Sequence, residues 1–292
     1  MIRRIVFVLI VISGIFNFSA AQKFQIEKHT LVYKEVDGVQ LEMVVYQPKP
    51  EINVQVPAIV FYFGGGWVSG NPDHFALQAE YLASRGMVAV CPDYRTKSKH
   101  GTTPFESVKD AISAMRYLKT HGAEMGIDTS RIVAAGGSAG GHLAACTALI
   151  DDVEEETDNT KISPKPFALV LFNPVVDTGK NGYGQEKLDG REFEISPVHH
   201  ITPNAPPTLI MHGKADDVVS YENVVRFRDV MKQEGNECIL KGYKKQGHGF
   251  FNYNQKPCFF RKTLQRTEVF LDEYNLLRGE SWVKKYVKSV ED

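Results

Sequence analysis

Short apolar runs alternate with helical patterns along most of this chain, and this alternation constrains its fold more than any other feature. The expected strands span residues 56–63, 87–91, 131–135, 168–172, 208–212 and 238–243, and the expected helices span 75–84, 105–120, 139–149, 223–233 and 259–277. Apolar strands that are separated by helices are typical of a parallel sheet covered on both faces. The sequence therefore predicts an α/β fold with a mostly parallel sheet.

Two further strands are expected before this alternation begins. Residues 29–36 and 39–46 have the pattern of strands, and Asp37-Gly38 lies between them. An Asp-Gly pair between two strands favours the tight turn of a β-hairpin. We therefore expect an antiparallel hairpin at one edge of the sheet.

No composition shift or linker divides the rest of the chain. Its 292 residues are 43% hydrophobic and 24% charged, with a formal net charge of −1. This composition is that of a soluble globular protein and gives no electrostatic reason to expect a nucleic-acid partner. We expect one domain over residues 22–292. Within it, the acidic stretch 151–158 is expected to be a solvated loop, and 177–207, with weak periodicity, a small cap.

The first 21 residues have the pattern of a secretory signal peptide. Arg3 and Arg4 precede an apolar run at 5–16, and small residues follow at 19–21. The run is shorter than the roughly 20 apolar residues of a membrane-spanning helix. We expect cleavage after residue 21, export to the periplasm or the extracellular space, and no stable membrane association afterwards. The alternative is an uncleaved amino-terminal anchor.

The sequence offers no pattern for a metal or a cofactor. Its four cysteines are Cys91, Cys146, Cys238 and Cys258, and no two have C-x-x-C spacing. The zinc motif H-E-x-x-H is also missing. We expect no metal and no cofactor, and a Cys238–Cys258 bridge stays open.

The first motif with chemical meaning is Gly136-Gly137-Ser138-Ala139-Gly140. It follows an expected strand and opens an expected helix, which is the context that a nucleophilic serine on a sharp turn requires. The flanking glycines remove side chains that would clash in such a turn. The alternative is an ordinary loop rich in glycine and serine.

A glycine run, Gly64-Gly65-Gly66-Trp67, follows an earlier expected strand. Glycines let a backbone turn its N–H groups toward a substrate, and such groups stabilise the negative charge that develops on a carbonyl oxygen in acyl transfer. No G-x-x-x-x-G-K-[ST] pattern supports a phosphate loop here. The alternative is a flexible turn.

An acid and a histidine follow two later strands. Asp216 and Asp217 come after the strand at 208–212, and His248 comes after the strand at 238–243. A histidine can take a proton from a serine, and an acid can hold that histidine in the required tautomer. Adjacent side chains diverge, so only one of the two aspartates can be the partner.

These motifs all lie at the carboxyl ends of expected strands, where ligands bind in open α/β sheets. The order serine, acid, histidine is that of the α/β-hydrolases. The chain resembles this superfamily, and within it the hormone-sensitive-lipase-like and acetyl-esterase-like enzymes. The residues that carry the resemblance are 63–67, 92–95, 128–131, 136–142, 196–197, 206–216 and 247–252.

The resemblance implies a mostly parallel sheet of the eight-stranded type and a serine esterase activity. It also implies roles for individual residues: Ser138 as nucleophile, His248 as base, Asp216 as acid, and the N–H groups of Gly65, Gly66 and Ala139 as the oxyanion hole. Two features depart from the pattern. Phe63 stands where the motif usually has histidine, and the long amino-terminal helical cap is missing, as in compact exported esterases that act on plant polysaccharides.

We therefore expect hydrolysis of short-chain acyl esters, acetyl above all, with a carbohydrate or another small molecule as the alcohol. Trp67, Phe250 and Phe251 are candidates for the substrate pocket, and burial in the core is the alternative for the two phenylalanines. Three other functions use the same fold: a serine peptidase, an acyltransferase, and a non-catalytic carbohydrate-binding relative.

Overall fold

The computed structural model describes residues 23–49 and 54–291, so the expected signal peptide at 1–21 lies outside the described residues. Within them, eight strands form one sheet in the order β1-β2-β4-β3-β5-β6-β7-β8. The strands are β1 (Gln25–Val36), β2 (Val39–Lys49), β3 (Val56–Tyr62), β4 (Val88–Pro92), β5 (Ile127–Gly137), β6 (Ala168–Phe172), β7 (Thr208–Gly213) and β8 (Cys238–Tyr243). All neighbours from β4 to β8 pair in parallel.

The antiparallel pair at the edge confirms the expected hairpin. β1 pairs with β2 in antiparallel register, and β2 also runs antiparallel to β4. Asp37 and Gly38 have φ angles of 52° and 74°, the left-handed conformations that a tight hairpin turn needs. The eight-stranded, mostly parallel sheet is therefore the one that the sequence predicts.

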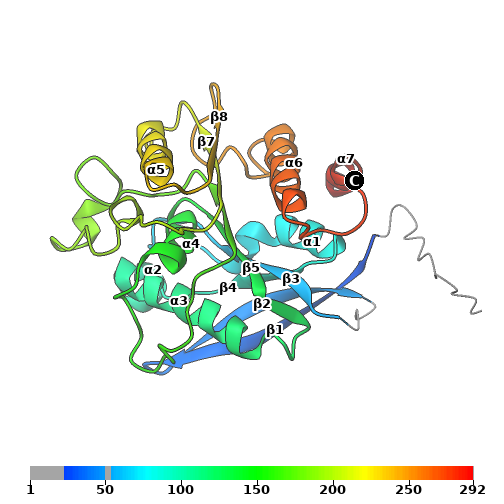
Figure 1. Cartoon of the computed structure of the whole chain (residues 1–292), viewed down its shortest axis with the longest axis horizontal. Helices are drawn as coiled ribbons and strands as arrows, with labels where there is room; N and C mark the ends of the chain where they lie inside the picture. The colour runs from blue at the N-terminus through cyan, green and yellow to red at the C-terminus, as the bar shows by residue number, and fades with distance from the viewer. Residues whose placement is uncertain (1–22, 50–53, 292) are drawn as a thin grey trace, which may run out of the picture.

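Helices cover both faces of the sheet (Figure 1). They are η1 (Pro72–Phe75), α1 (Ala76–Ser84), α2 (Lys97–His100), α3 (Pro104–His121), α4 (Ala139–Leu149), η2 (Gln185–Lys187), η3 (Pro197–His199), α5 (Tyr221–Gln233), α6 (Pro257–Glu273) and α7 (Val283–Glu291). Helices α3, α4 and α5 pack in one core, and α1, α6 and α7 pack in the other.

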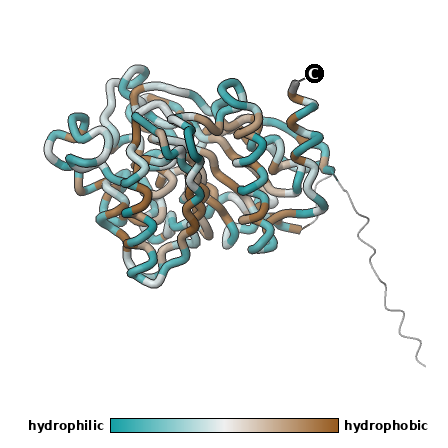
Figure 2. Tube along the Cα trace, turned by 90° about the horizontal axis from the view of Figure 1, so that it is seen from above, coloured by the Kyte–Doolittle hydropathy of each residue, from teal (hydrophilic) through white to brown (hydrophobic). Residues whose placement is uncertain are grey.

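Strand β3 shows how one strand serves both cores. Val60 and Tyr62 belong to the core under α3, α4 and α5, whereas Ile59 and Phe61 belong to the core under α1 and α6. Successive side chains of a strand point to opposite faces, so a strand buried on both faces must be apolar throughout. Figure 2 shows hydrophobic segments of the chain running through the interior, with hydrophilic segments mostly toward the outside.

The expectation that 151–158 is a solvated loop is wrong in part. Glu155 contacts the buried side chains of Lys34 and Arg95 at 2.9 and 2.6 Å, and Asp158 lies 3.0 Å from Arg116. These acids add negative charge beside buried cations that Asp110 and Glu154 also contact. The segment therefore ties the hairpin to α3 and is part of the packed structure.

All four cysteines are free, with Cys238 buried and Cys258 exposed. The Cys238–Cys258 bridge that the sequence left open therefore does not form. Among the described residues, no helix combines the length and the apolar character that crossing a bilayer requires.

Candidate active site

The turn between β5 and α4 holds Ser138 in a strained conformation. Its φ is 56° and its ψ is −122°, a region that non-glycine residues seldom adopt. The neighbouring positions must be glycine because a side chain there would clash with the backbone. A Cβ on Gly136 would lie 2.3 Å from the Gly140 carbonyl oxygen, and one on Gly140 would lie 2.1 Å from the Tyr62 carbonyl oxygen. The turn thus presents the serine as the glycine–serine motif predicts.

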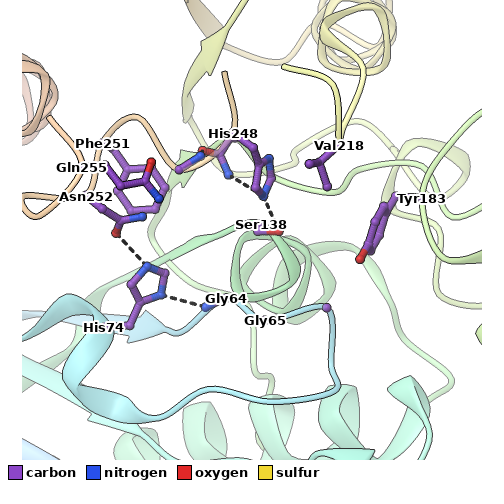
Figure 3. A pocket seen from close by; sticks show the side chains of 13 residues that line it. Gly64, Gly65, His74, Ser138, Tyr183, Val218, His248, Phe251, Asn252 and Gln255 are labelled. Carbon is purple, nitrogen blue, oxygen red and sulfur yellow. Dashed lines mark hydrogen bonds between the residues drawn. The ribbon is translucent and has the colours of Figure 1, made fainter. Parts of the chain in front are cut away.

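Ser138, His248 and Asp216 form one chain of hydrogen bonds, although they are far apart in the sequence. His248 Nε2 lies 2.9 Å from Ser138 Oγ (Figure 3), and His248 Nδ1 lies 2.8 Å from Asp216 Oδ2. Asp216 can accept a hydrogen bond from His248 only when Nδ1 of that histidine carries a proton. Nε2 is then unprotonated and can accept the proton of the Ser138 hydroxyl. The structure therefore brings together the three residues singled out from the sequence.

The structure also distinguishes the two adjacent aspartates. Asp216 Oδ1 accepts hydrogen bonds from the N–H groups of Val218 and Val219 at 3.0 and 2.9 Å, whereas Asp217 is exposed. Burial acts to raise the pKa of Asp216, but hydrogen bonds from His212 and His248 dominate and hold it below its usual value. Asp216 is therefore a carboxylate at neutral pH.

The glycine loop lies against Ser138 with an unusual backbone. Gly65, Gly66 and Trp67 have φ angles of 132°, 63° and 60°, and a Cβ on Gly65 would lie only 1.9 Å from the Ser69 carbonyl oxygen. Ala139 is the first residue of α4, where a backbone N–H has no partner within the helix. Gly65, Gly66 and Ala139 are the residues whose N–H groups the family resemblance implies for an oxyanion hole.

Phe63 supports this loop in place of the usual histidine. Its ring stacks on Tyr94 with centroids 3.9 Å apart, and the Tyr94 hydroxyl donates to the Phe63 carbonyl oxygen at 2.8 Å. Where the motif usually has a histidine, this chain thus has a phenylalanine that packs in the core against a tyrosine.

His74 is part of the site, although the sequence pattern did not single it out. Its Nδ1 accepts a hydrogen bond from the Gly64 N–H at 2.9 Å, and its Nε2 lies 2.8 Å from Asn252 Oδ1 (Figure 3). Because Nδ1 accepts, Nε2 carries the proton and donates to the amide oxygen. Burial, the largest cause, lowers the pKa of His74, and the nearby His248 adds to this. A neutral His74 therefore links the glycine loop to the loop that carries His248.

Asn173 is a second residue that the motifs missed. It follows β6 with a φ of 33°, its Oδ1 accepts from the Gly249 N–H at 3.0 Å, and its Nδ2 lies 3.5 Å from His248 Nε2. It comes directly after an expected strand, and that position is the one signal that could have pointed to it.

The cavity at Ser138 has a volume of about 290 Å³. Its lining includes Phe251, together with Tyr183 and Val218, which the sequence analysis did not name. In Figure 3, Tyr183 and Val218 lie on the side of Ser138 opposite Asn252 and Gln255. Tyr183 belongs to the stretch 177–207 expected to form a cap, which contributes two short 3-10 turns and loops.

Two of the candidate pocket residues lie elsewhere. Phe250 does not line the cavity at Ser138: it is buried in the core, the alternative that the sequence left open, where its ring packs on Tyr243 with centroids 4.9 Å apart. Trp67 lines a separate cavity of about 180 Å³. Among the described residues, no cluster of three or more histidines, cysteines or acids is placed to hold a metal ion.

A serine, a histidine and an aspartate hydrogen-bonded in this order at the strand ends of this sheet define an α/β-hydrolase. The sequence model of the BD-FAE family matches residues 43–180. An esterase of Gibberella moniliformis is 35% identical, over 70% of this chain and 70% of the relative. A probable isoprenylcysteine alpha-carbonyl methylesterase of Arabidopsis thaliana is 26% identical, over 76% of this chain and 50% of the relative.

Solved structures show the same likeness over more of the chain. Thermogutta terrifontis esterase 2, phosphoramylated by tabun, is 42% identical, with a TM-score of 0.83, over 87% of this chain and 97% of that one. The chain spans about half the length of the first two curated relatives it matches. It belongs to the α/β-hydrolase serine esterases of the hormone-sensitive-lipase-like type, a class of carboxylic ester hydrolases.

Proposed function

We propose that this chain hydrolyses carboxylic esters through an acyl-enzyme formed on Ser138. The observation that carries the proposal is the continuous set of hydrogen bonds from Asp216 through His248 to Ser138. Deprotonated Asp216 stabilises the imidazolium that forms when His248 takes the serine proton. The esterase names of the relatives support the same reaction class.

In the first half of the reaction, Ser138 Oγ attacks the ester carbonyl carbon while His248 Nε2 takes the hydroxyl proton. The N–H groups of Gly65, Gly66 and Ala139 stabilise the negative charge that develops on the carbonyl oxygen by donating hydrogen bonds to it. The carbonyl–alkoxy bond then breaks, and His248 returns the proton to the leaving alcohol. In the second half, a water oxygen attacks the acyl carbon while His248 Nε2 takes a proton from that water. The bond from the acyl carbon to Ser138 Oγ then breaks, and His248 returns the proton to Ser138 Oγ as the acid leaves.

We infer that the acyl group is short and that the alcohol is a carbohydrate or a similar small molecule. The active-site cavity is only about 290 Å³. Structures of the Thermogutta terrifontis esterase with propionate and with butyrate bound support a small acyl group. The leader pattern at 1–21 supports export to the periplasm or the extracellular space.

The test measures residues 22–292 on 4-nitrophenyl esters from acetate to decanoate, on acetylated xylan and on methyl ferulate, with Ser138→Ala as control. We expect the highest kcat/KM for acetate and release of acetate from xylan, both lost in Ser138→Ala. A preference for long chains or for ferulate would reject the acyl assignment and keep the mechanism. A folded protein inactive on every ester would favour the peptidase, transferase or binding alternatives.

A covalent inhibitor gives a readout that does not depend on the substrate. The Thermogutta terrifontis esterase is phosphorylated by paraoxon, and we expect paraoxon to label Ser138 of this chain, as seen in a peptide mass map. The Ser138→Ala protein should carry no label. Labelling of another residue with the same stoichiometry would overturn the choice of nucleophile.

Export is tested on the full chain. We expect the protein recovered from the periplasm or the medium to begin at Gln22, as read by mass spectrometry of its amino-terminal peptide. An intact leader on a membrane-bound protein would instead identify the uncleaved anchor.

A further inference from the structure

A second cavity adjoins the active-site cavity at the glycine loop. It has a volume of about 180 Å³, and Gly66 lines both cavities. Its other walls come from the segments 67–68, 97–104 and 186–189. Neither Ser138 nor His248 lines it, so the reaction proposed above does not account for it. We call it the Trp67 cavity.

Two polar side chains of the Trp67 cavity have buried atoms without a hydrogen-bond partner. Trp67 Nε1 and Thr102 Oγ1 are two of only six such side-chain atoms among the residues that the structure describes. The Trp67 side chain belongs to a residue that is 1% exposed. Folded proteins rarely leave buried donors unpaired, because the lost hydrogen bond to water is not replaced. Two unpaired groups on one cavity indicate a ligand that supplies the partners.

The charges around the Trp67 cavity indicate what kind of ligand this is. Lys97 and Lys187 contribute two positive charges, and Glu186 and Asp189 contribute two negative charges. The formal charges cancel, so the rim has no net preference for an anion or a cation. A neutral group with several hydroxyls suits such a rim, because each hydroxyl can both donate and accept a hydrogen bond.

The wall that the two cavities share at Gly66 is polar as well. Lys187 Nζ donates to the Tyr183 hydroxyl at 3.3 Å, and Tyr183 lines the active-site cavity. A Cβ on Gly66 would lie 2.9 Å from the Tyr183 hydroxyl oxygen and 3.6 Å from Lys187 Nζ. A glycine at this position thus leaves room beside both polar groups. The Tyr183 hydroxyl accepts from Lys187 and can donate its own proton to a substrate.

We propose that the Trp67 cavity is a subsite for a neutral, hydroxyl-bearing part of the ester substrate, of the size of one sugar ring. The proposal rests on the proposed ester hydrolysis at Ser138 and specifies its substrate. These hydroxyls belong either to the alcohol or to the acyl group of the ester, and the experiment below distinguishes the two cases. Trp67 Nε1 and Thr102 Oγ1 supply hydrogen bonds to them.

The experiment compares three esters on the purified protein. Methyl xyloside monoacetate carries hydroxyls on the alcohol, methyl glycerate carries them on the acyl group, and 4-nitrophenyl acetate carries none. In Thr102→Val we expect kcat/KM to fall about three- to tenfold for one of the two hydroxyl-bearing esters, because one hydrogen bond between neutral groups contributes about this factor. The value for 4-nitrophenyl acetate should change by less than about twofold, as expected when no contact is lost. The exposed Thr160→Val is the matched control.

A second variant changes the space and leaves these polar groups in place. Val68 lines the Trp67 cavity, and Val68→Phe should narrow it and produce the same selective loss. An unchanged ratio between hydroxylated and plain esters in both variants would overturn the subsite while ester hydrolysis stands. Equal losses on all three esters would also overturn it, since they indicate damage to the glycine loop.

Binding separates failure of the subsite from failure of the proposed reaction. Calorimetry with methyl xyloside monoacetate and with methyl glycerate on Ser138→Ala should show weaker binding of one of them in Ser138→Ala/Thr102→Val. If the wild-type protein hydrolyses no ester but this difference is found, the proposed function is wrong and the cavity remains a polyol site. If both proteins bind both esters equally, the subsite is wrong.

Discussion

At the scale of single residues, Asp216 is set apart from its neighbour by its contacts. It accepts hydrogen bonds from two backbone N–H groups and from His248, whereas Asp217 is exposed. An asparagine at 216 would favour the wrong tautomer of His248. We expect Asp216→Asn to lower kcat/KM for 4-nitrophenyl acetate by about 10³–10⁴-fold, and Asp217→Asn to change it by less than about twofold. A larger loss in Asp217→Asn would reverse the assignment.

His74 offers a second prediction at this scale, because it touches the glycine loop and not the reacting atoms. In His74→Phe the Gly64 N–H and the Asn252 amide oxygen lose their partner, and the loop that carries the oxyanion donors is less firmly held. We expect kcat to fall by about tenfold, less than the 10²–10³-fold loss of a whole donor, with KM changed little.

The control for His74 is His74→Asn, whose side-chain oxygen can replace Nδ1 as the acceptor for the Gly64 N–H. It should recover part of the lost kcat. Equal losses in both variants, or a rise in KM alone, would show that His74 does not position the loop.

At the scale of elements, a buried ion network joins the hairpin to α3. Asp110, which is fully buried, contacts Lys34 Nζ at 2.7 Å and Arg95 at 2.8 Å. Removing one member of such a set leaves the others charged and buried. We expect Asp110→Asn to lower the free energy of unfolding by about 3 kcal/mol, measured by urea denaturation.

The control for this network is the exposed pair of Glu27 and Lys49, at 2.8 Å, whose side chains are about half exposed. Glu27→Gln should lower the free energy of unfolding far less than Asp110→Asn does, because solvent screens an exposed pair. Similar costs for the two variants would mean that the buried network contributes no more than a surface pair.

Elements were predictable from the sequence where local pattern and packing agree. Helix α4 and strands β6 and β8 have the expected boundaries, since each is a run of mostly apolar or small residues between turn signals. Helix α7 was not predicted. It is short and is held by contacts distant in sequence, such as the Tyr286 hydroxyl bond to the Leu77 carbonyl oxygen at 2.7 Å.

The same reason explains which site residues the sequence revealed. Ser138, Asp216 and His248 each follow an expected strand, and their order along the chain matches that of a known family. His74 and Asn173 have meaning only through partners that folding brings near, Asn252 and Gly249. The ion pairs of Glu155 were missed likewise, because Lys34 and Arg95 come from other elements.

At the scale of the whole molecule, His142 joins three parts of the structure. It lies in α4, its Nε2 is 2.6 Å from the Ile195 carbonyl oxygen of the cap-like stretch, and its ring meets Trp67 edge-on at 5.0 Å. Burial lowers the pKa of His142 to about 4, below the usual value of about 6.5 in the unfolded chain. The native state therefore holds His142 neutral across a range where the unfolded chain takes up a proton.

This difference predicts how stability depends on pH. The contribution of neutral His142 is fully present above about pH 6.5 and is lost as the pH falls toward 4, by about 1.4 kcal/mol per pH unit. In His142→Gln the amide can still donate to the Ile195 carbonyl oxygen, but nothing titrates. Between pH 7 and pH 5 we expect the wild-type free energy of unfolding to fall by about 2 kcal/mol more than that of His142→Gln. Urea denaturation at both pH values measures this, and equal falls would show that His142 is protonated as readily in the native state as in the unfolded chain.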